Sequence, residues 1–457
     1  MSRHFYWTLA VIGAIALMLF GAVQFLRQIH PDDGSYIPRP VDPTPEIEML
    51  RNYVRIDTST PEGEVAGAKY LIRLLQQAGI SSELIESAPG HANVYARIRG
   101  SSQSGGLMLL HHIDVVPADP KDWSAPPFEG RITSGLMWGR GTIDMKGIGI
   151  CELAAFVAIA RSGKRPLHDV VFLAVADEEH GGRLGMEWIA EHRPDVLEGI
   201  DFAINEGGIT EMKGDELTYF GVEIGTKAWM KARVVSDSKE KLEEARIALE
   251  PYYSPREPNE ILPAVREYFA SIAPYRIEAR SLLGDIDRTV ARGEFWKLDS
   301  SYRDLTQNNV GSSGIARSPD GRWSMRVYLD LLPGVDGKAY LKNLHRKFFP
   351  DAEVTLLGDS GPIGFSSWTT PFSAVLKAEI ARQYPGAPAG PVILSRSSTD
   401  SRFLRARGIE AYGLMPYRVN FFQSHGVHAV DENIRLDWFT EGVELTRNVV
   451  KRWCDVQ

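Results

Sequence analysis

From Glu46 onward, the sequence alternates between segments with a helical spacing of apolar residues and short apolar runs. Helical spacing marks residues 46–56, 66–80, 147–163 and 438–453, and strand-like runs lie at residues 92–98, 106–116, 169–179 and 201–208. Strands that alternate with helices favour a mostly parallel sheet with helices on both faces. The sequence therefore predicts an α/β fold.

Polar residues gather where three of the predicted strands end. The segments "HHID", "DEEH" and "NEGG" each follow an apolar run. In open α/β sheets, ligand sites lie beyond the carboxyl ends of the strands. We therefore expect these clusters to form one site, in which the adjacent residues Glu178 and Glu179 serve chemistry rather than stability.

The character of the sequence changes after Gly225, where longer and more charged helical segments such as residues 238–251 precede a strand pair. A chain of 457 residues is long enough for two domains. We predict a catalytic domain built from residues 46–224 and 353–457. A smaller α+β domain, residues 225–352, is inserted into it.

The segment from Phe5 to Leu26 carries no charge over 22 residues. At about 1.5 Å per helical residue, it is long enough to cross a hydrocarbon core of about 30 Å. We predict an uncleaved transmembrane anchor at residues 5–26 and a linker at residues 27–45, with the body exported to a periplasmic or other extracytoplasmic space. A cleaved signal peptide is the alternative.

Charge and cysteine content exclude several classes of protein. The net charge is −8 and the acidic residues are scattered, which is unlike the basic stripe of a nucleic-acid-binding protein. The two cysteines, Cys151 and Cys454, cannot form a disulfide framework or a CxxC zinc site. Cys151 is expected to be a core residue, and one disulfide between the two stays open.

The candidates for chemistry are dispersed histidines and carboxylates. They are His112 and Asp114 in an H-x-D pair, Asp144 in a glycine-rich turn, Glu178, Glu179, Glu206, and the group His425, His428, Asp431 and Glu432. Imidazole nitrogen and carboxylate oxygen are ligands for zinc. Two histidines and three carboxylates suffice for two zinc ions if one carboxylate bridges them. Asp114 suits the role of holding the other nitrogen of His112.

Each of these motifs alone has a plainer explanation. An H-x-D pair on a strand is usually an ordinary hydrogen bond, and Asp144 is also a typical helix cap. Adjacent glutamates and a histidine pair are common in solvated loops. Found together at successive strand ends, these motifs favour a metal site.

Longer stretches resemble one enzyme family. The segments "HHIDVVPADPKDW", "WGRGTIDMKG" and "ADEEHGG" match its two signatures, and "YVRIDTSTPEGE" and "HAVDENI" match its terminal segments. The family includes acetylornithine deacetylase, succinyl-diaminopimelate desuccinylase, aminoacylase, glutamate carboxypeptidase G and carboxypeptidase S. The resemblance covers residues 46–222 and about 356–457, and the apolar N-terminal segment is similar to the membrane-anchored carboxypeptidase S subgroup.

The resemblance implies two zinc ions, with cobalt or manganese as substitutes, and a role for each motif residue. Asp144 bridges the ions, His112 and Glu206 complete one site, and Glu179 and His428 complete the other. The family's H-x-D and H-x-x-D-E spacings select His112 over His111 and His428 over His425. The resemblance also implies Glu178 as the general base and a cis peptide after Asp144, and Asp114 is counted with Glu178 among the catalytic residues. Substrate contacts are expected from Thr399, Asp400 and the family asparagine, which is Asn308 or Asn309 and is assigned to Asn309.

The implied activity is hydrolysis of an amide bond in N-acyl amino acids or short peptides. A water that bridges the two zinc ions attacks the carbonyl, and Glu178 takes its proton and returns it to the leaving amine. Because residues 169–179 are predicted to be extended, the side chains of the two adjacent glutamates are expected to point apart.

The predicted insertion departs from this family. The lid histidine that stabilises the oxyanion is missing, because His345 is the only histidine between residues 225 and 352. Asp330 stands where the family often has a substrate-binding arginine, which suggests a neutral or cationic substrate terminus. The altered lid weakens the homodimer that the resemblance implies. A membrane-tethered zinc-binding module with weak or lost catalysis is therefore the alternative function.

Overall fold

The structure is a computed structural model that describes residues 38–318, 320–361, 364–395 and 398–456. The predicted transmembrane anchor, residues 5–26, lies outside these ranges. Within them, no helix has both the length and the apolar character needed to cross a membrane.

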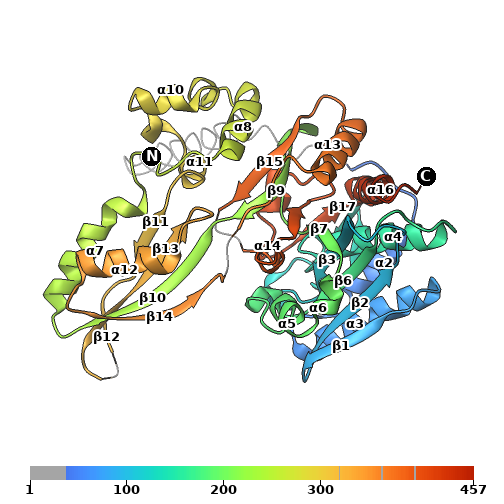
Figure 1. Cartoon of the computed structure of the whole chain (residues 1–457), viewed down its shortest axis with the longest axis horizontal. Helices are drawn as coiled ribbons and strands as arrows, with labels where there is room; N and C mark the ends of the chain where they lie inside the picture. The colour runs from blue at the N-terminus through green and yellow to red at the C-terminus, as the bar shows by residue number, and fades with distance from the viewer. Residues whose placement is uncertain (1–37, 319, 362–363, 396–397, 457) are drawn as a thin grey trace, which may run out of the picture.

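A nine-stranded sheet forms the centre of the larger part of the molecule (Figure 1). Its strands, in spatial order, are β1 (Glu83–Ala88), β2 (His91–Ile98), β6 (Val170–Val175), β3 (Gly106–His112), β7 (Ile200–Asn205), β16 (Glu410–Gly413), β9 (Glu216–Thr226) and β15 (Ala389–Leu394), with β8 (Ile209–Lys213) paired to β9.

The expectation of a mostly parallel sheet holds only for the middle of this sheet. Strands β6, β3, β7 and β16 run parallel to one another, and the outer strands β9 and β15 form a second parallel pair. The β1–β2, β2–β6, β8–β9 and β16–β9 pairs are antiparallel. The sheet is therefore mixed, and the polar clusters lie at the carboxyl ends of its central parallel strands.

Helices cover both faces of the large sheet, as predicted. One layer contains α2 (Pro45–Val54), α3 (Pro61–Gln77), α4 (Lys146–Arg161), α13 (Pro371–Gln383) and α16 (Leu436–Trp453), and the other contains α5 (Met186–His192), α6 (Pro194–Leu197) and α14 (Ser401–Arg405). Successive side chains of β3 pack alternately against the two helical layers. Leu107 and Leu109 belong to the first core, and Met108 and Leu110 to the second.

Three of these helices begin in the same way, at Thr44–Pro45, Thr60–Pro61 and Thr370–Pro371. In each case the threonine hydroxyl accepts a hydrogen bond from a backbone N–H in the first turn. The proline that follows has no N–H and already has a helical φ, so it is well suited to the first helical position.

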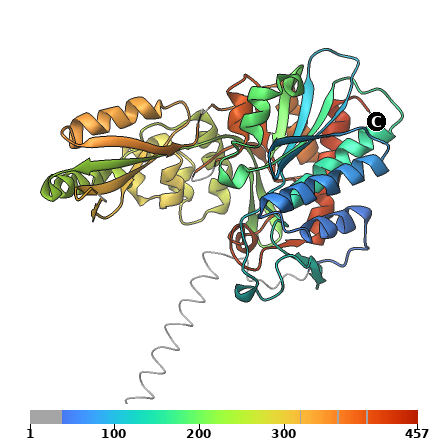
Figure 2. The same cartoon turned by 90° about the horizontal axis from the view of Figure 1, so that it is seen from below.

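A second, five-stranded sheet lies at the other end of the molecule (Figure 2). It contains β11 (Asn309–Ser312), β13 (Trp323–Leu331), β10 (Ala228–Ser236) and β14 (Glu353–Asp359), with β12 (Ala316–Arg317) paired to β13. Helices α7 (Lys239–Tyr253) and α12 (Gly337–Phe348) share a core with one face of this small sheet. Alternate residues of β10 and β13 enter that core.

The two sheets are joined at neighbouring points. Strand β9 leads directly into β10, and the return segment passes Phe365, which pairs with Gly225. The helices α8 (Pro263–Ile272), α9 (Arg280–Leu283), α10 (Ile286–Ala291) and α11 (Ser300–Asp304) follow α7, and α8 belongs to the core of the large sheet. The predicted domain boundaries stay a prediction, although β14 continues the small sheet beyond Ala352.

Candidate metal centre

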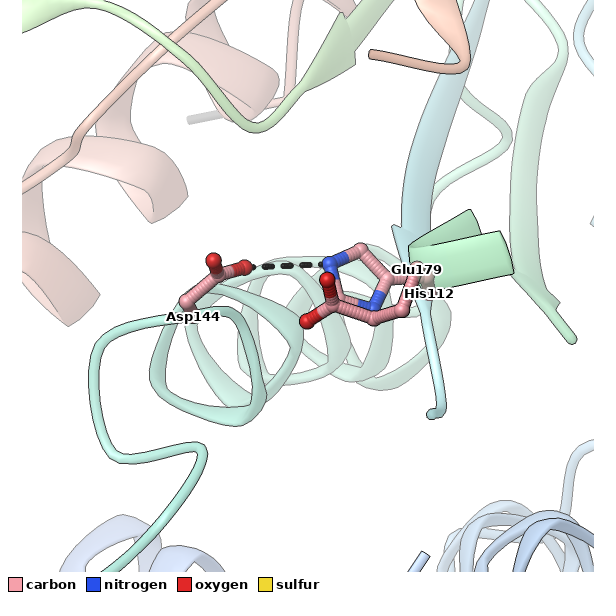
Figure 3. A group of neighbouring side chains, drawn as sticks. All are labelled: His112, Asp144 and Glu179. Carbon is pink, nitrogen blue, oxygen red and sulfur yellow. Dashed lines mark hydrogen bonds and ion pairs between the residues drawn. The ribbon is translucent and has the colours of Figure 1, made fainter. Parts of the chain in front are cut away.

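Three neighbouring parallel strands bring the predicted polar clusters together. His112 is the last residue of β3, Glu178 and Glu179 follow β6, and Glu206 follows β7. Because these strands are adjacent and parallel, their carboxyl ends meet at one edge of the sheet. Figure 3 shows His112 beside Asp144 and Glu179, which reach the same place from different elements.

Asp144 lies in the turn between β5 (Leu136–Trp138) and α4, and a buried glutamate holds this turn. Glu432 accepts hydrogen bonds from the backbone N–H groups of Gly141 and Ile143, at 3.1 and 2.7 Å, and pairs with Arg140 at 2.7 Å. A small sheet of β4 (Arg131–Thr133), β5 and β17 (Asn433–Arg435) places Glu432 there. The peptide bond after Asp144 is cis, as the resemblance implied.

The two carboxylate oxygens of Asp144 face two different histidines. Oδ1 lies 3.1 Å from His112 Nε2, and Oδ2 lies 3.0 Å from His428 Nε2. Each histidine also faces its own glutamate. Glu206 Oε2 is 3.8 Å from His112 Nε2, and Glu179 Oε2 is 3.1 Å from His428 Nε2. This is the arrangement expected of one carboxylate between two metal sites.

The donor atoms of this cluster suit metal ions. Two groups have their possible ligand atoms within 4.8 Å of one another, namely His112 with Asp144 and Glu179, and His112 with Glu178 and Glu206. In the described part of the chain, no lysine or arginine forms an ion pair with any of these four carboxylates. Clustered carboxylates and imidazoles without a cationic side chain fit a divalent cation such as zinc.

The proton affinities of the cluster reflect this crowding. Burial, together with the nearby charge of Asp144, raises the pKa of Glu206 to about 7. Burial and the charge of Glu206 hold the pKa of Glu178 well above its usual range. Hydrogen bonds from the His428 ring to Asp144 and Glu179 raise the pKa of His428 to about 10. Without metal, protons therefore compensate part of the negative charge.

Asp114 connects three residues of the site. Its carboxylate oxygens accept hydrogen bonds from the backbone N–H groups of Glu178 and Glu179, at 3.1 and 3.0 Å. Its backbone carbonyl accepts one from His112 Nδ1 at 2.9 Å, which leaves Nε2 directed at Asp144. The H-x-D spacing predicted only the contact with His112, because the bonds to the glutamates depend on the neighbouring strand.

The two glutamates are not extended, so the explanation that their side chains alternate was wrong. Glu178–His180 forms a short 3-10 helix, η2, preceded by Asp177 with a φ of 65°. Side chains in such a helix are separated by one third of a turn. The separation still places Glu179 near Asp144 and Glu178 near Glu206.

Other predicted residues lie outside the metal cluster. Asn309 belongs to the small sheet, where its side-chain amide donates to Asp304 Oδ1 at 2.8 Å. Thr399 and Asp400 are buried, and a Cβ on Gly182 would lie 2.4 Å from Asp400 Oδ1, so Asp400 packs beside the glycine turn after Glu179. Their roles in substrate binding stay predictions.

Asp330 does not present an uncompensated charge to a substrate. Its carboxylate lies 2.7 Å from Nζ of Lys227, whose side chain is fully buried. The suggestion of a neutral or cationic substrate terminus therefore loses its basis. His345, the other residue of the insertion considered above, lies on α12, and its Nε2 is hydrogen-bonded to the backbone carbonyl of Ala352.

The cysteines and the remaining histidines of the motifs have ordinary places. Cys151 and Cys454 are buried free thiols, so the open alternative of a disulfide is closed. His111 is buried beside Glu152, with their side-chain atoms 3.3 Å apart. His425 Nδ1 shares a 3.4 Å contact with Ser424 Oγ, whereas His428 reaches Asp144.

Comparison with known proteins identifies the family of this chain. Peptidase family M20/M25/M40 is matched over residues 108–452. Aminoacylase-1 of Mus musculus is 27% identical over 421 residues, which cover 88% of this chain and 93% of that protein. A succinyl-diaminopimelate desuccinylase of Bradyrhizobium sp. is 30% identical over 204 residues, 43% of this chain and 51% of that protein.

The fold is shared with a solved structure. An M20-family metallo-carboxypeptidase from Sulfolobus solfataricus superposes with a TM-score of 0.68 and 19% sequence identity, covering 90% of this chain and all of that one. The family match spans well over half of the present sequence and includes His112, Asp144, Glu179, Glu206 and His428. The chain is therefore a hydrolase that belongs to peptidase family M20/M25/M40.

Proposed function

We propose that this protein is a zinc-dependent hydrolase that cleaves the amide bond of N-acyl amino acids or short peptides. The observation that carries the proposal is the position of Asp144 between His112 and His428, with one carboxylate oxygen facing each ring. Aminoacylase-1, which aligns over most of the chain, supports the same class of substrate.

His112, Asp144 and Glu206 would hold one zinc ion, and Asp144, Glu179 and His428 the other; cobalt or manganese are possible substitutes. Zinc bound there lowers the pKa of water and polarises the scissile carbonyl. Every donor is an imidazole nitrogen or a carboxylate oxygen, as zinc prefers.

Glu178 is the general base in this proposal. In the metal-free chain, burial and the charge of Glu206 raise the pKa of its carboxyl group. A carboxylate placed beside the metal ligands would accept a proton from water and return it to the leaving amine. The hydrogen bond from its backbone N–H to Asp114 fixes its position beside the metal ligands.

The test combines a metal count with an activity assay on the full chain. Glu178→Ala keeps all five proposed ligands, so we expect two zinc ions per chain by mass spectrometry of the metal. Hydrolysis of N-acetyl amino acids and dipeptides should fall by about 10²- to 10⁴-fold. Undiminished hydrolysis in Glu178→Ala would exclude Glu178 as the base. Two bound zinc ions without turnover in the unaltered chain would favour the non-catalytic zinc-binding module.

We also propose that residues 5–26 anchor the protein in a membrane with its body exported. Their uncharged sequence supports this. Alkaline extraction of membranes would leave an anchored chain in the pellet, and N-terminal mass analysis would distinguish it from a cleaved one.

A further inference from the structure

One face of the small sheet has a charge pattern that the hydrolase function does not use. The face of β10 and β13 that is turned away from α7 and α12 contains Trp229, Lys231, Arg233, Arg326 and Tyr328, which we call the open face. Ser324 and Asp330 lie on the same side of β13. None of these residues is buried, and the exposed fractions of Trp229 and Tyr328 are 43% and 40%.

Two arginines of the open face lie directly opposite each other. Arg233 on β10 pairs in register with Arg326 on the antiparallel strand β13. Side chains at such positions are roughly 5 Å apart at Cβ, and like charges there repel. On its other side, Arg233 faces Thr355 of β14, which brings no charge.

No acidic side chain offsets this pair. Among the residues that the structure describes, no carboxylate lies within ion-pair distance of Arg233 or Arg326. The only acid on β10 or β13 is Asp330, and it pairs with Lys227. Glu353 of β14 pairs with Arg322. Among the described residues, the three cations of the open face therefore form no ion pair with Asp330 or Glu353, the carboxylates that lie on the same side of the sheet.

Aromatic rings lie beside these cations. Lys231 is opposite Tyr328, and its Nζ is 5.9 Å from the centre of that ring. Trp229 follows on the same face, next to Gly358 of β14. Exposed Trp and Tyr beside Lys and Arg are typical of surfaces that contact the interfacial region of a bilayer, where the rings enter the headgroups and the cations attract anionic lipids.

We propose that the open face of the small sheet docks on an anionic phospholipid surface. Charge complementarity carries the proposal, because three cations gather on one sheet face of a chain whose net charge is −8. The N-terminal sequence adds a second argument. If the uncharged segment 5–26 is in the bilayer, residues 27–37 extend at most about 40 Å, so the body stays near the membrane and even weak contacts suffice.

The test uses the full chain reconstituted into vesicles, with an environment-sensitive bimane label on Ser324→Cys. Ser324 lies on the open side of β13, two residues before Arg326, and both native cysteines are buried. We expect a blue-shifted emission in vesicles of phosphatidylcholine and phosphatidylglycerol at 7:3. We expect none in phosphatidylcholine alone, and added salt should reverse the shift.

A matched pair of variants locates the effect. Arg233→Gln with Arg326→Gln should lower the docking equilibrium by about 25-fold, since each cation contributes about fivefold near an anionic surface. Lys338→Gln with Lys342→Gln removes the same charge from exposed positions of α12, which covers the other face, and should leave docking unchanged.

Two outcomes would overturn the proposal. One is equal bimane emission in both kinds of vesicle, which would show that the open face does not bind anionic lipid and would favour an acidic protein as its partner. The other is an equal loss of docking in both double variants, which would reduce the effect to net charge. Hydrolysis of a soluble dipeptide should be unchanged in both double variants, so failure of docking is distinguishable from failure of the proposed catalysis.

Discussion

At the scale of single residues, the chemistry of the site depends on how Asp114 and Asp144 divide their oxygens. Asp144 gives one oxygen to each histidine, and Asp114 gives one to the backbone of each adjacent glutamate. The hydrogen bonds to Asp114 hold the backbone of Glu178 and Glu179 in place, so that their side chains point to different parts of the site.

Replacing Asp114 by asparagine should therefore disturb both glutamates. The amide would direct an N–H group at one of the two backbone N–H donors, whereas the backbone carbonyl that accepts a hydrogen bond from His112 Nδ1 would remain. We expect zinc affinity to fall by about 10- to 100-fold, as for other residues that hold metal ligands. Competition with a chromogenic chelator measures this affinity. Asp119→Asn, on the exposed loop after β3, is the control and should bind zinc normally.

Zinc uptake should also depend on pH. Hydrogen bonds to Asp144 and Glu179 raise the pKa of His428 to about 10 in the metal-free chain, and burial raises that of Glu206 to about 7. Below these values the groups carry protons that zinc must displace. Affinity should therefore rise at least tenfold per pH unit between pH 6 and 8. Calorimetry in two buffers of different ionisation enthalpy would detect the released protons, and a flat affinity would contradict the assignment.

The ligand residues were predictable because their spacing within each segment is short and specific. The supporting contacts were not. Arg140 and Glu432 are 292 positions apart in the sequence. Asp114 is 64 positions from Glu178, and the local pattern of residues around either one does not record that they meet. The pairing of Lys227 with Asp330 escaped prediction for the same reason.

At the scale of elements, helices and strands followed the spacing of apolar residues, but strand direction did not. Residues 92–98 were predicted as a strand, and they form part of β2, which is antiparallel to β6. The direction of a neighbour depends on the connection between strands, which apolar spacing does not record. The end of β6 was placed too late, because η2 begins where the carboxylates do.

Strand β13 offers a test of the repulsion on the open face. If Arg326 is held opposite Arg233 without a counter-ion, Arg326→Gln should raise the free energy of unfolding by about 0.2–1 kcal/mol. Urea unfolding of the full chain in detergent measures this change. Arg346→Gln on the exposed side of α12 serves as the control, and a destabilised Arg326→Gln would mean that Arg326 has a favourable partner.

At the scale of the whole molecule, a buried ion pair lies where the two sheets join. Lys227 follows β9 directly, and its Nζ contacts Asp330 of β13 and the carbonyl of Asp304, at 2.7 and 3.0 Å. The split of the chain around an insertion was predictable from the change in charge pattern. The packing of α8, α9 and α10 in the core of the large sheet was not predictable, because the spacing of apolar residues does not record which core they enter.

Lys227→Met should uncouple this junction. It removes the Lys227 ammonium from the Asp330 carboxylate and the Asp304 carbonyl, and the loss of such a buried donor costs about 1–3 kcal/mol. Thermal unfolding, followed by circular dichroism, should then separate into two steps. Adding Asp330→Asn removes the charge that Lys227 compensated and should recover most of the loss. A single transition with an unchanged midpoint would show that the pair does not couple the sheets.

The junction at Gly225 and Phe365 also bears on how such a protein can change over evolutionary time. Both ends of the small sheet leave the large one at neighbouring points, and all five proposed metal ligands come from outside residues 228–359. Apart from the helices α8 to α10, which pack in the core of the large sheet, this stretch of the gene can therefore change without replacing a ligand. Related proteins with the same metal ligands can therefore differ in the small sheet and its helices, and such differences can change the substrate or the place in the cell where the enzyme acts.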